Sequence, residues 1–171
     1  MKGVPRSFFA RDSRVVAPEL LNKVLVRGGR SGRIVEVEAY AGAEDPASHG
    51  FGGPTPRNEV MFGRAGHLYV YFTYGMHFCA NAVCGGVGQS SAVLLRALAP
   101  LTGLEEMRSA RGLAAKRDRD LCSGPAKLCQ AFGLDRDQDG VDLVRGEDVG
   151  VFDDGTSPPA RPGVSPRIGI S

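Results

Sequence analysis

The chain has 171 residues, a formal net charge of +2 at pH 7 and 42% hydrophobic residues, the size and composition of one domain with a substantial core. No stretch approaches the roughly 18 apolar residues of a membrane span, and the N-terminus lacks a secretory apolar region, so we expect an intracellular protein that binds no membrane. Residues 1 to 131 carry 17 Lys and Arg against 11 Asp and Glu, whereas residues 132 to 171 carry 4 against 8. A basic main body suits a polyanionic partner.

The cysteines and histidines do not form a metal motif. They are scattered at Cys79, Cys84, Cys122, Cys129, His49, His67 and His77, without the paired CxxC spacings of a zinc site. We therefore expect buried free thiols, no metal and no cofactor. A small metalloenzyme built from these residues is one rival interpretation.

The first predicted elements are a helix and a strand. Ser13 to Leu21 is predicted as a short helix with Ser13 as its N-cap, and Lys23 to Arg27 as a strand that ends at the Gly28-Gly29 turn.

The segment from Arg33 to Tyr40 is predicted as a strand with two unlike faces. Strict alternation places Ile34, Glu36, Glu38 and Tyr40 on one face. It places Val35, Val37 and Ala39 on the other. The periodicity fits an edge strand with a solvated acidic face as well as it fits a strand that carries a site.

A turn-rich run with three prolines and four glycines follows from Gly42 to Pro56 and is predicted as a loop that positions functional groups. Residues 67 to 83 then read as two strands joined near Tyr74-Gly75, where Gly75 supplies the positive φ that a hairpin turn requires. Tyr74 is expected at the exposed tip. The second strand places His77, Cys79 and Asn81 on one face.

Beyond the hairpin, Ser91 to Leu98 is predicted as a strand that is apolar on both faces apart from Arg96, which is either paired in the core or directed into a site. A capping box formed by Thr102 and Glu105 predicts a helix over residues 103 to 111. Another helix is expected between Pro125 and Gly133. Lys127 in its first turn is either solvated or bound to a phosphate at the helix N-terminus.

The acidic segment from Asp135 to Gly140 resembles the start of an EF-hand loop, but Gly146 stands where the bidentate glutamate belongs, so an acidic surface turn is predicted. Short strands are expected at residues 141–144, 149–152 and 167–170. Sequential strands with few helices predict an α+β fold. We expect a single compact domain over residues 1–171, with a curved, mainly antiparallel, barrel-like sheet and peripheral helices.

Five motifs occur in a characteristic order: Val-Glu-Ala-Tyr40, Thr-Pro-Arg-Asn58, Leu-Tyr-Val-Tyr71, Tyr-Gly-Met76 and Cys-Ser-Gly-Pro-Ala-Lys-Leu-Cys129. With them the chain resembles the alkyladenine (3-methyladenine) DNA glycosylase family, the single-domain type also found in mammals, from about residue 6 onward. Family members usually continue past residue 171 and often carry tyrosine where His77 stands. The resemblance implies a monomer that acts on duplex DNA containing damaged purines, in the cytoplasm at the nucleoid of a bacterium or in the nucleus of a eukaryote.

The resemblance also implies roles for individual residues. Glu38 is the expected general base, since it shares a face with Tyr40 and can activate a water that attacks C1′. The walls of the base pocket are expected to be Tyr40, His49, Tyr71, Asn81, Ile168 and Gly169, with Asn81 excluding the 2-amino group of guanine. The expected DNA contacts are Tyr74 as the intercalating wedge, Met76, His77, Arg96 and Lys127.

Two further classes of enzyme fit the sequence less well. The spacing of Glu36 and Glu38 resembles the carboxylate pair of an inverting glycoside hydrolase, but the aromatic neighbours suit a flat base better than a sugar. A lyase needs an amine nucleophile, and no lysine occurs between Lys23 and Lys116, which predicts hydrolysis without strand cleavage. A nucleic-acid-binding module without chemistry is the remaining rival.

Overall fold

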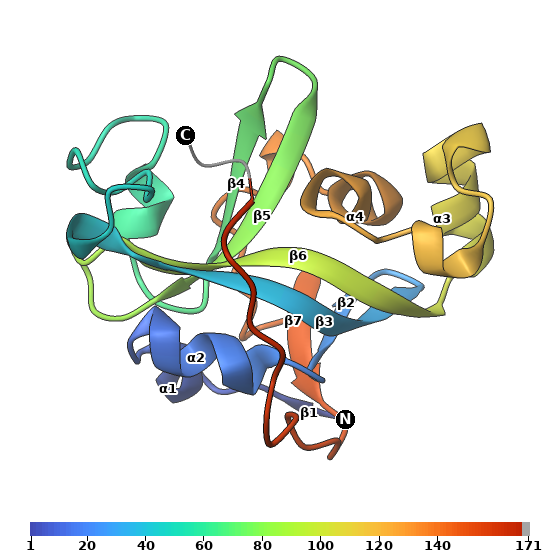
Figure 1. Ribbon diagram of the computed structural model, residues 1–171, viewed down its shortest axis with the longest axis horizontal. Helices are drawn as coiled ribbons and strands as arrows, with labels where there is room; N and C mark the ends of the chain where they lie inside the picture. Colours follow the sequence, from blue (N-terminus) through green and yellow to red (C-terminus); the bar gives the residue numbers. More distant parts are fainter. Residues whose placement is uncertain (169–171) are drawn as a thin grey trace.

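The computed structural model describes residues 1–168, and within them seven strands form one sheet in the order β1-β7-β2-β3-β6-β5-β4. The strands are β1 (Lys2–Gly3), β2 (Val24–Arg27), β3 (Arg30–Ala41), β4 (Leu68–Thr73), β5 (His77–Cys84), β6 (Ser91–Thr102) and β7 (Val149–Asp153). Every pairing among these described strands is antiparallel. Figure 1 shows the sheet curled on itself with short helices around it. The predicted α+β class with a curved antiparallel sheet is confirmed.

The helices pack on the curled sheet around one large core. They are α1 (Arg6–Phe9), α2 (Ser13–Leu20), α3 (Leu104–Arg111) and α4 (Pro125–Phe132). In Figure 1, α1 and α2 lie below β3, whereas α3 and α4 lie above β6. Side chains from four of these elements meet in the core with no exposed surface: Leu20, Ile34, Leu95 and Phe132. None of the described helices has the length and the apolar character needed to cross a membrane.

Two predicted helix caps are wrong, for the same reason. Ser13 does not cap α2, because its hydroxyl donates to the Tyr40 carbonyl at 2.9 Å; Asp12 accepts from the Arg14 amide instead. Thr102 does not cap α3, because it belongs to β6 and donates to the Gly29 carbonyl at 3.1 Å. Both hydroxyls donate to carbonyl groups that are distant in the sequence and are not available as caps. The boundaries predicted for α4 are confirmed, with proline at its start and Gly133 left-handed at its end.

Two of the three strands predicted in the last third are not present as predicted. Residues 141–144 form only an isolated bridge between His67 and Asp142, because the chain turns at Leu143; backbone hydrogen bonds still join Val141 to Leu68 and Leu143 to Gly66 and Val151. Arg167 and Ile168 are in no strand, and the rest of that segment, with Gly169, lies outside the described residues. The acidic segment before them forms a short 3-10 helix (Arg136–Gln138), capped by the Asp135 carboxylate.

Strand β3 departs from strict alternation between Ile34 and Val37. The pairing with β6 shifts register on both sides of Glu36, so that Ile34 lies opposite Leu98 while Val37 lies opposite Leu95. Ile34 is fully buried, Val37 packs on the same core, and Val35 is exposed. The prediction that Ile34 shares a face with Glu38 is therefore wrong, because the double register shift behaves as a β-bulge that turns part of the strand over.

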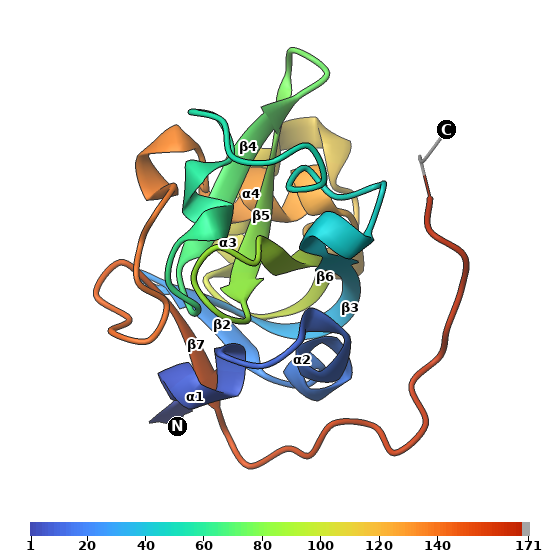
Figure 2. The same ribbon diagram turned by 90° about the vertical axis from the view of Figure 1, so that its left-hand side faces the viewer.

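Residues 154–168, here called the C-terminal strap, have no regular structure. Figure 2 shows the strap leaving β7, crossing below the sheet and rising beside β3 toward the site described next. This course matters because β3 pairs with β2 only through Arg33, which leaves the second half of β3 without a strand on that side.

Candidate active site

One row of side chains crosses four strands of the sheet at the site. Glu38 on β3 lies opposite Leu94 on β6, Leu94 lies opposite Asn81 on β5, and Asn81 lies opposite Tyr69 on β4. Paired residues in adjacent strands project from the same face of a sheet. Glu38, the predicted general base, and Asn81, predicted to exclude the 2-amino group of guanine, are far apart in the sequence. They therefore project from one surface of the sheet.

The carboxylate of Glu38 is nearly enclosed, with 9% of its side chain exposed. One of its oxygens accepts a hydrogen bond from the hydroxyl of Tyr40, and the other accepts from Arg96 Nη1 at 3.0 Å. Each carboxylate oxygen can accept more than one hydrogen bond, so a water can still bind. The carboxylate is held rigidly as an acceptor, which is what a general base requires.

Arg96 is paired with two carboxylates, and one of them is Glu38 of the site, so the two alternatives raised for it do not exclude each other. Its Nε donates to Glu36 at 2.7 Å while its Nη1 binds Glu38, and the register shift of β6 beside Arg96 turns the side chain toward β3. The two carboxylates differ in environment, because 55% of the Glu36 side chain is exposed. Glu36 is therefore screened by solvent as an ordinary surface carboxylate is. Glu38 is the carboxylate that belongs to the site.

The aromatic groups that follow β3 and fill β4 form a wall beside Glu38. The ring of His49 lies 4.3 Å from that of Tyr71, centroid to centroid, in an edge arrangement, and its Nδ1 is 3.2 Å from the hydroxyl of Tyr69. Edge-on contacts of this kind are favourable between aromatic rings. Asn58 supports the loop from behind by donating to the His49 carbonyl at 2.8 Å.

The enclosure keeps these aromatic groups neutral near pH 7. Burial raises the pKa of Tyr69 to about 12 and, together with the hydrogen bond to Glu38, raises the pKa of Tyr40 above its usual value. The outer edge of His49 is exposed, yet its packing on the tyrosines excludes water from part of the ring; this burial and then the charge of Arg57 lower the pKa of His49. A neutral wall of electron-rich rings attracts cations.

These residues enclose a small cavity of about 30 Å³, lined by Tyr40, Ala47, His49, Met61, Tyr69, Tyr71 and Asn81. Four of the predicted pocket residues are therefore brought together. The volume is about that of one water molecule in the liquid. Asn81 is almost fully buried and donates to the Tyr69 carbonyl at 3.3 Å.

Three lining residues were missed by the sequence analysis. Tyr69 was detectable, because it alternates with Tyr71 and so shares its face of β4. Ala47 and Met61 come from the loop and from a 3-10 turn (Glu59–Phe62), and neither residue type signals a pocket.

The predicted wedge lies at the tip of the β4–β5 hairpin. Tyr74 is 83% exposed, and Met76 and His77 are exposed beside it. The backbone of Gly75 has the expected positive φ of 68°, and Tyr74 shares it with a φ of 52°, which is uncommon for a residue other than glycine. The tip stands clear of the sheet at the top of Figure 1.

The remaining predicted residues lie around this surface. A groove runs from Met76 and His77 to Ala126 in α4, next to the exposed Lys127. Ile168 is exposed and lines a second groove, about 470 Å³ in volume, between the strap and β3, which also contains Glu38 and Arg96. Gly169 lies outside the described residues. In residues 1–168 no three His, Cys, Asp or Glu side chains cluster as metal ligands would.

The site combines an enclosed carboxylate, an aromatic cavity and an exposed hairpin tip. Similarity to known proteins identifies the class of enzyme: the chain is a DNA glycosylase, a hydrolase of N-glycosyl bonds. The model of the family "Methylpurine-DNA glycosylase (MPG)" matches residues 7–171. The chain belongs to this family.

Named relatives support the assignment, and each carries the name "Putative 3-methyladenine DNA glycosylase". The relative from Burkholderia cenocepacia (strain HI2424) is 61% identical over 169 residues, 98% of this chain and 81% of the relative. The relative from Rhodopseudomonas palustris (strain ATCC BAA-98 / CGA009) is 55% identical over 138 residues, 81% of this chain and 66% of the relative. The relative from Koribacter versatilis (strain Ellin345) is 47% identical over 174 aligned positions, 98% of this chain and 84% of the relative.

Proposed function

We propose that this protein is a monofunctional base-excision repair glycosylase. It flips alkylated or deaminated purines (3-methyladenine, 7-methylguanine, hypoxanthine and ethenoadenine) out of duplex DNA and hydrolyses the N-glycosidic bond, leaving an abasic site. The observation that carries the proposal is the enclosed carboxylate of Glu38, which Tyr40 and Arg96 fix beside the aromatic cavity.

The first step is extrusion of the damaged base. Unstacking costs a few kcal/mol, least for a base pair that is already damaged. Tyr74 at the hairpin tip fills the vacated stack as an inserted side chain does in other minor-groove binders. Met76, His77, Lys127 and Arg96 are the proposed contacts with the surrounding duplex.

The second step is capture of the base between Tyr40 and the rings of His49 and Tyr71. Stacking of a base on an aromatic side chain is worth about 1–3 kcal/mol, and a cationic alkylated purine gains from the electron-rich ring faces. Asn81, buried at the wall of the cavity, disfavours the additional 2-amino group of guanine. Ile168 and Gly169 are proposed to border the base from the side of the strap.

The third step is hydrolysis. A water held by Glu38 attacks C1′ while the carboxylate accepts its proton, the bond between C1′ and the purine nitrogen breaks, and its electron pair leaves with the base. A cationic alkylated purine then leaves as a neutral molecule. No lysine lies between Lys23 and Lys116 to replace this water as a nucleophile, which supports hydrolysis without a lyase step.

The proposed partner is duplex DNA, bound by a monomer. The named relatives come from bacteria, so we place the activity at the nucleoid.

Duplexes that each carry one methylated purine, hypoxanthine or ethenoadenine test the proposal in buffer containing a metal chelator. We expect a free base in solution and strand breaks only after alkali treatment. Loss of activity in the chelator would indicate a metalloenzyme, and breaks without alkali would indicate a lyase. Tight binding without release of any base would leave only a binding module.

A further inference from the structure

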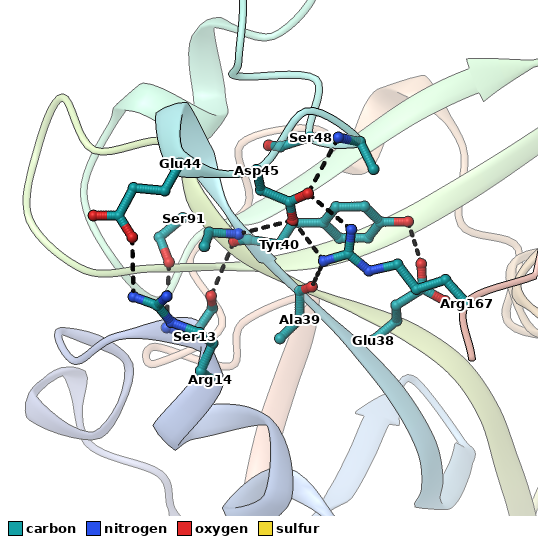
Figure 3. A network of polar contacts seen from close by, with 12 residues as sticks. Ser13, Arg14, Glu38, Ala39, Tyr40, Glu44, Asp45, Ser48, Ser91 and Arg167 are labelled. Carbon is teal, nitrogen blue, oxygen red and sulfur yellow. Dashed lines mark hydrogen bonds and ion pairs between the residues drawn. The ribbon is translucent and has the colours of Figure 1, made fainter. Parts of the chain in front are cut away.

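The C-terminal strap is joined to the pocket through the side chain of Arg167. Its Nη1 and Nη2 donate to the two carboxylate oxygens of Asp45 at 2.8 and 2.5 Å, and Nη2 also donates to the Ala39 carbonyl at 2.8 Å. The guanidinium carbon lies 4.8 Å from the centre of the Tyr40 ring. Figure 3 shows Arg167 reaching Asp45 and Ala39 directly beside Tyr40, whose hydroxyl points to Glu38.

Asp45 connects Arg167 to the loop after β3 that contains Ala47 and His49, here called the pocket loop. It is 7% exposed and also accepts hydrogen bonds from the backbone amides of Ala41 at 3.3 Å and Ala47 at 3.1 Å. The hydrogen bonds from Arg167, opposed by burial, hold the pKa of Asp45 below its usual value. One carboxylate therefore ties the end of β3 to Ala47, a lining residue of the cavity, and His49 follows two residues later.

Resting on the proposed function, we propose that Arg167 is a positioning residue for base excision. Through its ion pair with Asp45 and its contact with the ring of Tyr40, it sets the spacing between the two walls that sandwich the purine. Bidentate pairing of arginine with a carboxylate fixes direction as well as distance. No other described residue links the strap, the pocket loop and Tyr40 in this way.

The position of Arg167 is that of a residue that supports the cavity from outside and does not line it. It lines the groove that contains Glu38 and Arg96 and is absent from the lining of the aromatic cavity. Tyr40 is thus held at two points, its hydroxyl by Glu38 and its ring by Arg167. Because the Tyr40 hydroxyl donates a hydrogen bond to Glu38, displacement of the Tyr40 ring also disturbs Glu38, the proposed general base. Misplacement by about 1 Å can reduce an enzymatic rate by about 10²-fold.

A matched control exists at the other end of the strap. Arg33 forms an ion pair of the same kind with Asp154 at 2.7 Å, also with two hydrogen bonds, but it touches neither Asp45 nor Tyr40. Arg33→Met therefore removes a comparable anchor of the strap without disturbing the pocket. Arg167→Met keeps the length of the side chain and removes its charge and hydrogen bonds, and Arg167→Lys keeps the charge but not the bidentate geometry.

The test compares these three variants with the wild type in single-turnover release of hypoxanthine from a duplex. The second readout is the fluorescence of bound ethenoadenine, which reports stacking of the flipped base. We expect Arg167→Met to release the base about 10 to 100 times more slowly than the wild type, with an altered fluorescence signal. Arg167→Lys should be intermediate. Arg33→Met should stay within about 3-fold of the wild-type rate at a similar melting temperature. Equal rates and signals for Arg167→Met and Arg33→Met would overturn the proposal.

Hydrogen exchange without DNA separates this proposal from the proposed function. Amide exchange in residues 42 to 50 should rise in Arg167→Met and not in Arg33→Met. Unchanged exchange in both variants would overturn the positioning role even in a fully active enzyme. An increase specific to Arg167→Met would support that role, and it would still do so if the wild-type protein released no base, a result that would refute the glycosylase activity instead.

Discussion

The root and the tip of the β4–β5 hairpin carry the same residue type in opposite surroundings. Tyr69, at the root, is 1% exposed and hydrogen-bonded to His49, whereas Tyr74, at the tip, is 83% exposed. The cause is the extent of the sheet. Strand β5 pairs with β6 only from Asn81 to Cys84, so the hairpin extends beyond its neighbour from there to the tip. The sheet therefore supports an enclosed wall and an exposed probe on one pair of strands.

In the proposed function the two regions have different tasks: the root and the adjoining end of β3 bind and cleave the extruded base, and the tip enters the duplex. The following experiments test whether the two regions can be separated.

The largest effect is expected at Glu38. Glu38→Gln should slow base release by about 10²–10⁴-fold, the usual contribution of a general base, while binding of a lesion duplex stays within a few-fold. Glu36→Gln is the control, because Glu36 shares Arg96 but is mostly exposed. Single-turnover rates and equilibrium binding measure the two quantities, and near-normal rates for Glu38→Gln would assign the base elsewhere.

Truncating a ring at each end of the hairpin should separate their effects on stability. Tyr69→Ala should lower the free energy of unfolding by about 3–5 kcal/mol, as for other large buried aromatic side chains. Tyr74→Ala should lower it by less than about 0.5 kcal/mol, as at an ordinary surface position. Denaturant unfolding measures both. A marked loss in Tyr74→Ala would mean that its ring packs in the fold.

Tyr74→Ala should also separate search from chemistry. Without the wedge the flipping equilibrium shifts back by up to the few kcal/mol that unstacking costs, so release from a stably paired lesion falls far more than release from a mismatched or single-stranded one. Stopped-flow fluorescence with a base analogue beside the lesion follows the flipping step. Equal losses on paired and unpaired substrates would place the wedge at another residue.

The root should also show a pH dependence that the tip lacks. The pKa of His49 is held below 6.5, so below about pH 6.5 the unfolded chain binds more protons than the folded one and stability falls as the pH falls. One proton gives at most about 1.4 kcal/mol per pH unit, and the exposed edge of His49 makes the slope smaller. Unfolding of the wild type and His49→Gln from about pH 7.5 to about pH 5 isolates this contribution; parallel curves would contradict it.

The smallest effect is expected on DNA binding at two proposed phosphate contacts. Lys127→Ala and Arg96→Ala should each weaken binding to all duplexes alike and reduce the slope of log affinity against log salt by about 0.9, one phosphate contact. Arg96→Ala should in addition slow release, because Glu38 loses a partner. An unchanged slope would confine Arg96 to its ion pairs and leave Lys127 a solvated lysine.

The sequence by itself determined the features that depend on neighbouring residues. Alternation placed Cys79 and Asn81 on one face of β5, Tyr74-Gly75 marked the turn, and Pro125 and Gly133 marked the ends of α4. These signals are local, since side-chain direction, positive φ and the missing amide of proline are properties of a few consecutive residues. The motifs and their order indicated the family, because a motif is recognised from the sequence alone.

Only the tertiary structure decided which distant groups meet. The register shift between Ile34 and Val37 depends on the partner strand β6, and residues 141–144 are strand-like in composition but turn after Asp142, so that they form only an isolated bridge. The ion pair between Asp45 and Arg167 joins residues 122 positions apart, which no periodicity encodes. Such contacts form only when the curled sheet and the strap bring the chain back on itself, and two of them hold the site: Arg96 donates to Glu38, and the Arg167 guanidinium lies over the ring of Tyr40.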